Sequence, residues 1–154
     1  MDSRWGSLIV AAALAAPRPV AAQRVVELGA QATALAADPG SMFGGAYGAL
    51  RTSLRTRVSV AAGVGAVEGS AAVRGELLLH FLLNPTRRTG VAPYAAGGVA
   101  VVGGPLDEGY LVLTLGLESR PGARLGWFVE AGIGGGARLA AGIRRRWFPA
   151  GWSN

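Results

Sequence analysis

Hydrophobic and polar residues alternate at every second position over segments of about ten residues. In the segment 109–118, leucine stands at four successive odd positions, and the even positions carry smaller or polar residues. The segment 71–83 is similar, with Arg74 and Glu76 on the face opposite to Leu77. A period of two residues is the spacing of a β-strand, whose successive side chains point to opposite faces.

Eight segments of this kind are separated by stretches rich in glycine, proline, serine and arginine. They lie at residues 25–35, 42–51, 55–67, 71–83, 91–103, 109–118, 125–134 and 137–148, and the second and fifth alternate poorly. The longest charge-free stretch, 89–106, contains two prolines and five glycines, which makes it a poor helix even in lipid. The sequence therefore predicts an all-β chain of eight strands, with both ends on the same side.

The polar face of these strands consists of glycine, alanine and serine with scattered charges, which suits the narrow interior of a small closed sheet. We therefore expect an eight-stranded antiparallel up-and-down transmembrane β-barrel. Trp127, Trp147 and Phe148 near strand ends are typical of a membrane interface. Alternation alone does not fix which face lies inside. A soluble lipocalin-like binding barrel, with its leucines turned inward, is therefore the alternative.

The first 22 residues have the layout of a secretory signal peptide. Arg4 precedes an apolar run at 8–16, which is too short to span a bilayer, and Val20 and Ala22 suit a cleavage site after Ala22. An uncleaved N-terminal anchor is the alternative, because Asp2 offsets the positive charge of the leader. We therefore expect a signal peptide at 1–22, a barrel at 23–148 and a short tail at 149–154.

Composition narrows the classes of function. The 154 residues allow one domain, and only 16% of them are charged, against about 25% in a typical soluble protein. Without cysteine there is no disulfide, thiolate metal site or thiol nucleophile, and a single histidine argues against a zinc site, so we expect no cofactor. The net charge is +6, but arginine, the sole basic residue type, recurs at turns and forms no stripe. Binding to nucleic acid is therefore not expected.

The turns divide by charge between the two ends of the expected barrel. Arginine is frequent around 51–55, 84–90 and 119–124, whereas the turns at the other end carry acidic or neutral residues, such as Asp38, Glu68, Asp107 and Glu108. With the mature N-terminus on the periplasmic side, the arginine-rich end should face the periplasm and the acidic end the exterior.

The pattern from Arg24 to Phe148 resembles the small eight-stranded outer-membrane barrels, the group of the outer membrane protein A transmembrane domain, the outer membrane protein W family and opacity-type surface proteins. The most specific piece is the segment 91–100, similar to a Pro-Tyr strand with spaced glycines, although Gly97-Gly98 alters that spacing. The last strand resembles the assembly signal of this group through Gly142, Trp147 and Phe148, but Arg145 takes an expected apolar place. The resemblance implies outer-membrane lipid and the barrel-insertion machinery as partners.

Nine charged residues fall on the expected inner face. They are Glu27, Arg57, Arg74, Glu76, Glu118, Glu130, Arg138, Arg144 and Arg146. Unpaired buried charges are costly, so we expect them to pair and to plug the lumen. His80 is the single candidate for a catalytic base, it lies near the arginine-rich end, and no catalytic serine is evident. We therefore do not expect an enzyme.

The function expected from these patterns is that of an outer-membrane β-barrel protein with a structural or surface-contact role. A narrow pore or a conduit for small hydrophobic molecules is an alternative, in which excess arginine would set the selectivity. The soluble binding barrel is the third possibility. It predicts that the leucines of 111–117 point into a closed core.

Overall fold

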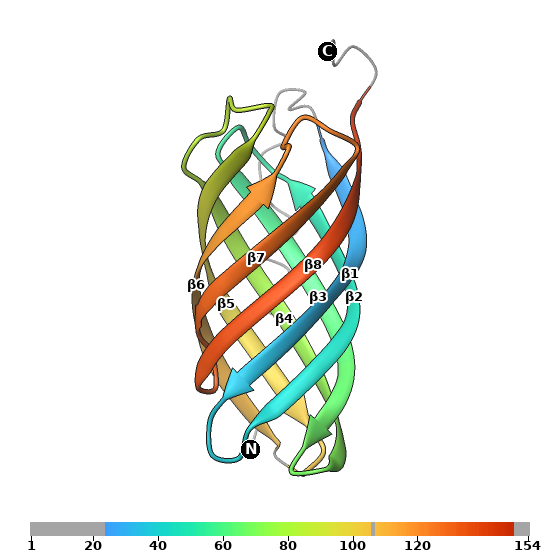
Figure 1. Ribbon diagram of the computed structural model, residues 1–154, viewed down its shortest axis with the longest axis vertical. Helices are drawn as coiled ribbons and strands as arrows, with labels where there is room; N and C mark the ends of the chain where they lie inside the picture. The colour runs from blue at the N-terminus through green and yellow to red at the C-terminus, as the bar shows by residue number, and fades with distance from the viewer. Residues whose placement is uncertain (1–23, 106, 150–154) are drawn as a thin grey trace, which may run out of the picture.

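Eight antiparallel strands form a closed barrel in the computed structural model, which describes residues 24–105 and 107–149 (Figure 1). The strands are β1 Val26–Ala36, β2 Ser41–Arg51, β3 Thr56–Val67, β4 Ser70–Leu82, β5 Val91–Gly103, β6 Glu108–Ser119, β7 Leu125–Ile133 and β8 Ala137–Trp147. The prediction of an all-β, eight-stranded antiparallel barrel is confirmed. The first and last residue of each predicted strand agree with the structure to within one residue. The expected signal peptide at 1–22 and residues 150–154 of the expected tail lie outside the described residues.

Each strand pairs with its neighbours in the sequence, and β1 pairs with β8 to close the barrel. This last ladder runs from Val26 opposite Trp147 to Ala36 opposite Ala137. Closure satisfies the backbone hydrogen-bonding groups that an open sheet would leave at its edges. In the part of the chain that the structure describes, no helix is long and apolar enough to cross a membrane.

The two faces of the wall differ sharply in chemistry. Large hydrophobic side chains point away from the barrel on all eight strands, and the leucines of β6 are 44–78% exposed. The inner face buries charged residues, with Arg57, Arg138 and Arg144 each 1% exposed. The leucine face therefore lies outside, and the charged face fills the interior.

The interior also contains apolar layers. The residues that form one buried cluster near the turn between β1 and β2 are Leu35, Phe43, Val67, Ala72 and Val102, with Tyr110 packed against them. Further along β5 and β6, Ala96, Ala100 and Val112 pack against Leu78 of β4. Inward-facing alanine and valine on β5 explain why this segment alternates poorly in the sequence.

Gly45 of β2 has no side chain, which allows β2 and β3 to approach each other closely. A Cβ atom there would lie 2.0 Å from the carbonyl oxygen of Ala62 on β3, which is far inside contact distance. Its neighbour Gly44 faces outward, and a Cβ there would meet nothing within 4 Å. The small inner residues of the sequence therefore reflect backbone contact as well as limited space in the lumen.

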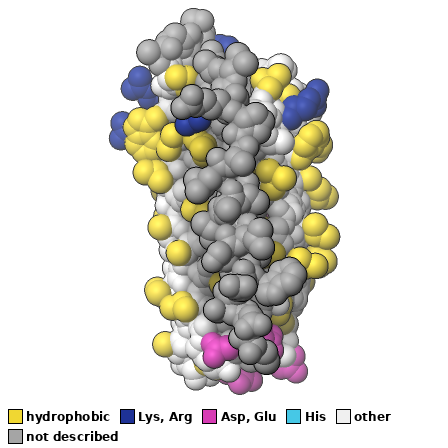
Figure 2. All heavy atoms as spheres, turned by 180° about the vertical axis from the view of Figure 1, so that it is seen from behind, with side chains coloured by type: hydrophobic (Ala, Val, Ile, Leu, Met, Phe, Trp, Pro, Cys, Tyr) yellow, Lys and Arg dark blue, Asp and Glu magenta, His cyan; other side chains and the backbone are white. Residues whose placement is uncertain are grey.

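The two ends of the barrel carry opposite charge. The turns between β2 and β3, β4 and β5, and β6 and β7 form one end, which we call the arginine rim. The turns between β1 and β2, β3 and β4, β5 and β6, and β7 and β8 form the acidic rim. Figure 2 shows basic side chains at one end, acidic side chains at the other and hydrophobic side chains over the visible wall between them.

Candidate functional site

All nine charged residues expected in the interior are buried, and each takes part in at least one ion pair. They divide into two groups along the barrel. The first charge cluster, toward the arginine rim, consists of Glu27, Glu118, Arg57, Arg144 and Arg146. The second charge cluster, toward the acidic rim, consists of Glu76, Glu130, Arg74 and Arg138.

Glu118 of β6 is the centre of the first charge cluster. Its Oε2 atom lies 2.9 Å from Nη1 of Arg57 and 3.2 Å from Nη2 of Arg146, and it also accepts a hydrogen bond from Arg144. Glu27 is the second carboxylate, with its Oε2 atom 3.0 Å from Nη1 of Arg144. Three arginines thus share two carboxylates, which leaves one positive charge in excess in this cluster.

Arg138 of β8 joins the two carboxylates of the second charge cluster. Its Nη1 atom lies 2.7 Å from Oε2 of Glu130, and its Nη2 atom lies 2.8 Å from Oε2 of Glu76. Arg74 completes the cluster, with Nε 2.8 Å from Oε1 of Glu76 and Nη2 donating to the carbonyl oxygen of Gly134. Two arginines and two glutamates balance, so the cluster is neutral.

Aromatic side chains lie between the charges. The Arg144 guanidinium carbon is 5.0 Å from the ring centroid of Phe128, and that of Arg57 is 5.0 Å from the ring centroid of Tyr94. The Tyr94 hydroxyl donates to Oε1 of Glu130 at 2.9 Å, which links the two clusters. Cation–π contacts of this kind stabilise desolvated guanidinium groups.

A serine and the single histidine also meet in the interior. The Oγ atom of Ser59 lies 2.7 Å from Nε2 of His80, and Nη2 of Arg57 lies 3.2 Å from Nδ1 of the same ring. Arginine only donates hydrogen bonds, so Nδ1 is the acceptor, and Nε2 carries the proton that it donates to Ser59. Activation of a serine requires the opposite arrangement, in which an unprotonated Nε2 accepts its proton and a carboxylate orients Nδ1. In this arrangement His80 does not activate the Ser59 hydroxyl as a nucleophile, and their hydrogen bond links β3 to β4.

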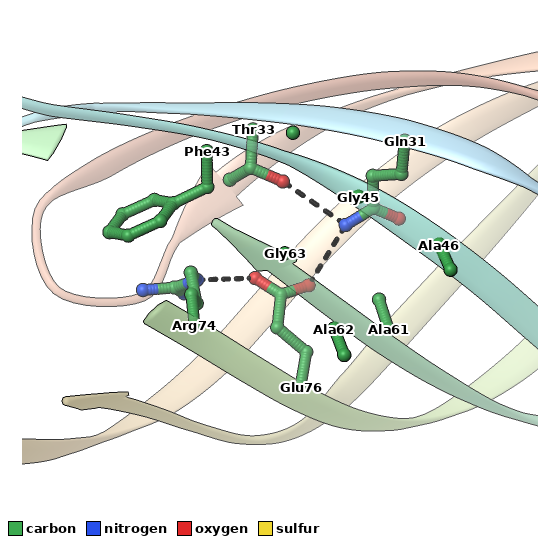
Figure 3. Close-up of a pocket in the computed structure, with 11 residues that line it drawn as sticks. Gln31, Thr33, Phe43, Gly45, Ala46, Ala61, Ala62, Gly63, Arg74 and Glu76 are labelled. Atoms are coloured by element: carbon green, nitrogen blue, oxygen red, sulfur yellow. Dashed lines mark hydrogen bonds and ion pairs between the residues drawn. The ribbon is translucent and has the colours of Figure 1, made fainter. Parts of the chain in front are cut away.

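A small cavity lies beside the second charge cluster (Figure 3). Its volume is about 20 Å³, and its lining includes Gln31, Thr33, Phe43, Arg74 and Glu76. Figure 3 shows the Gln31 amide between Thr33 and Glu76, to which its Nε2 atom donates at 3.1 and 3.3 Å. A volume of this size accommodates about one water molecule.

Four polar side chains that hydrogen-bond to the buried charged residues or to His80 were not among the interior residues expected from the sequence. They are Tyr47, Ser59, Tyr94 and Gln31. Tyr47, whose hydroxyl accepts from Nη1 of Arg144 at 3.3 Å, lies on β2, where alternation is weak. Ser59 becomes a partner of His80 only through the pairing of β3 with β4, in which Arg57 lies opposite His80. A strand pattern gives the face of each residue but not its partner on another strand.

The chain matches no model of a known protein family, and a search of curated proteins finds no similar sequence. Among residues 24–105 and 107–149, no group of three or more histidine, cysteine or acidic residues is arranged to hold a metal ion.

Proposed function

We propose that this chain is an outer-membrane β-barrel protein with a structural or surface-contact role, and that paired arginine and glutamate side chains plug its lumen. The observation that carries the proposal is the combination of an apolar outer wall with a buried ionic interior. Soluble monomers rarely expose a contiguous apolar surface of more than a few hundred Å². In a membrane barrel, by contrast, the outward face is apolar and the interior is polar.

The outer wall supports contact with lipid on every strand. Exposed large hydrophobic residues include Leu28 on β1, Val64 on β3, Leu77 on β4 and Leu139 on β8, each at least 49% exposed. Trp147 at the end of β8, on the side of the arginine rim, is also exposed, as are interfacial aromatic residues of membrane barrels. The expected signal peptide agrees with delivery to the outer membrane, and the closing strand with assembly by the barrel-insertion machinery.

The geometry of the lumen supports a plug more than a pore. Arg138 crosses the interior from β8 to Glu76 on β4, and Arg57 reaches from β3 to Glu118 on β6. The two pairs cross the lumen at different levels, and the cavity beside the second charge cluster holds about one water molecule. A narrow pore or hydrophobic conduit would require these pairs to separate.

Arginine substitutions on the outer wall test contact with lipid. Leu113 lies at the middle of β6, and Leu54 lies in a turn of the arginine rim; the two are 61% and 63% exposed. In a bilayer, Leu113→Arg should lower the free energy of unfolding by about 2–4 kcal/mol, whereas Leu54→Arg should lower it by about 0–1 kcal/mol. The two variants are compared by their free energy of unfolding in lipid vesicles and by the amount of each that is found in the membrane fraction of cells. A chain that stays monomeric in the soluble fraction without detergent, and equal stability of the two variants, would support the soluble barrel instead.

Electrical recording tests the plug separately. Purified full-length chain in a planar bilayer should show little or no steady conductance. A Glu130→Ala variant, which leaves Arg138 without one of its two carboxylates, should unfold more readily and show brief openings. Steady conductance of the wild type, with a change in ion selectivity alone in the variant, would contradict the plug and favour the pore.

A further inference from the structure

A cup opens at the acidic rim, apart from the two charge clusters. Its volume is about 300 Å³, the lower end of the range for pockets that hold small molecules. It is lined by residues of β1, β2, β3, β5 and β6 and by the turns between β1 and β2 and between β7 and β8. The mouths of β-barrels are frequent places for such pockets.

The floor of the cup is apolar. Leu35, Val67 and Val102 line it, and all three belong to the buried cluster that also contains Phe43. The Arg74 guanidinium, which belongs to the second charge cluster, lies 5.9 Å from the ring centroid of Phe43 in this apolar cluster. Arg74 is itself paired with Glu76, and the second charge cluster to which both belong is neutral.

The lip of the cup is acidic. Asp38, in the turn between β1 and β2, and Glu108, at the start of β6, both line the cup and are exposed. The Tyr110 hydroxyl donates a hydrogen bond to Oε2 of Glu108, which orients this carboxylate beside the tyrosine ring that also lines the cup. No basic residue is found in the lining that the structure describes.

We propose that this cup binds a small organic cation with an aromatic or hydrocarbon body. The body would lie on Leu35, Val67 and Val102, and the cationic group would lie between the carboxylates of Asp38 and Glu108. Burial of apolar area drives the first contact, and the attraction of opposite charges selects the cation over a neutral molecule of the same shape. The proposal depends on the fold alone, so it can fail or succeed independently of the membrane location.

Three probes of nearly equal shape separate these contributions: 2-phenylethylammonium, neutral 2-phenylethanol and anionic 3-phenylpropanoate. Binding to the purified full-length chain in micelles of a non-ionic detergent is measured by ligand-observed NMR titration. The cation should bind saturably, the alcohol at least about tenfold more weakly, and the anion not detectably. Added salt should weaken binding of the cation, because both carboxylates are exposed to solvent.

Matched variants locate the binding. Asp38→Asn with Glu108→Gln removes two charges from the lip and should reduce affinity for the cation to that for the alcohol. Glu68→Gln with Asp107→Asn removes two charges from the same rim outside the cup lining and should leave the affinity within about twofold. Equal loss in both pairs would show a general effect of the rim charge and overturn the proposal.

Filling the cup provides a second, independent test. Ser41 of β2 lines the cup, and Ser41→Trp should abolish binding of both the cation and the alcohol in a chain that still folds. Saturable binding that survives in folded Ser41→Trp, or equal affinity of the wild type for the cation and the alcohol, would overturn the proposal. If Ser41→Trp does not fold, the charge variants decide the question alone.

Discussion

Glu118→Gln tests whether the first charge cluster stabilises the barrel. Glu118 is 4% exposed, and its Oε2 atom is shared by Arg57, Arg144 and Arg146. Glutamine preserves the size of the side chain and one oxygen acceptor but removes the charge, so that three arginines face Glu27 alone. The excess of one positive charge in this cluster becomes two. Neutralising one partner of a buried ion pair costs about 3–5 kcal/mol, which is the destabilisation that we expect.

A second substitution shows whether charge causes this loss. Arg146→Gln removes one guanidinium, so the double variant with Glu118→Gln has two arginines and one glutamate and again an excess of one. The two substitutions should therefore be less than additive, with a coupling free energy of about 1–3 kcal/mol. Glu68→Gln is the matched control, because it is the same chemical change at an exposed turn of the acidic rim. It should alter stability by less than about 0.5 kcal/mol.

Equilibrium unfolding by guanidinium in detergent micelles measures these differences. Trp127 and Trp147 on the outer wall report loss of the folded barrel through their fluorescence. Electrophoresis of unheated samples beside heated, unfolded samples gives an independent measure, because a barrel that stays folded in the gel migrates differently from the unfolded chain. If Glu118→Gln were as stable as Glu68→Gln, or if its effect and that of Arg146→Gln simply added, the shared carboxylate would not be what holds the cluster together.

The strands could be predicted from the sequence because large outward side chains recur at every second position. The segment expected at 109–118 and the observed β6, Glu108–Ser119, differ by one residue at each end. The segment 91–103 alternates weakly, but its bounds can still be predicted from the sequence because clear turns precede and follow it. Its inner face carries Tyr94 and valine or alanine where other strands carry charges, which is why periodicity alone was a weak signal there.

The identity of the inner charges was also predictable, but their partners were not. Alternation places Arg138 and Glu76 on the inner face, yet these residues belong to β8 and β4, which are not neighbours in the barrel. Their contact depends on the stagger between strands around the closed sheet, which accumulates over several ladders. A contact between adjacent strands, such as Glu27 opposite Arg146, depends on a single register and is the easiest kind to anticipate.

Three further predictions concern the close contacts of the interior. Gly45→Ala should destabilise the barrel by about 1–3 kcal/mol because its Cβ would collide with the backbone of β3, whereas Gly44→Ala, which faces open space, should change stability little; thermal unfolding of both compares them. Tyr94→Phe removes a hydroxyl that donates to a buried carboxylate and should cost about 1–3 kcal/mol in the same guanidinium titration. Arg144→Lys tests why the interior uses arginine. The Arg144 guanidinium contacts two carboxylates through different nitrogen atoms while lying 5.0 Å from the ring centroid of Phe128. A lysine ammonium carries all its N–H donors on a single nitrogen atom and has no planar face to lie against the ring. Arg144→Lys should therefore destabilise the barrel by at least about 1.5 kcal/mol although the charge is unchanged, and wild-type stability of this variant would show that charge alone, without guanidinium geometry, suffices in the lumen.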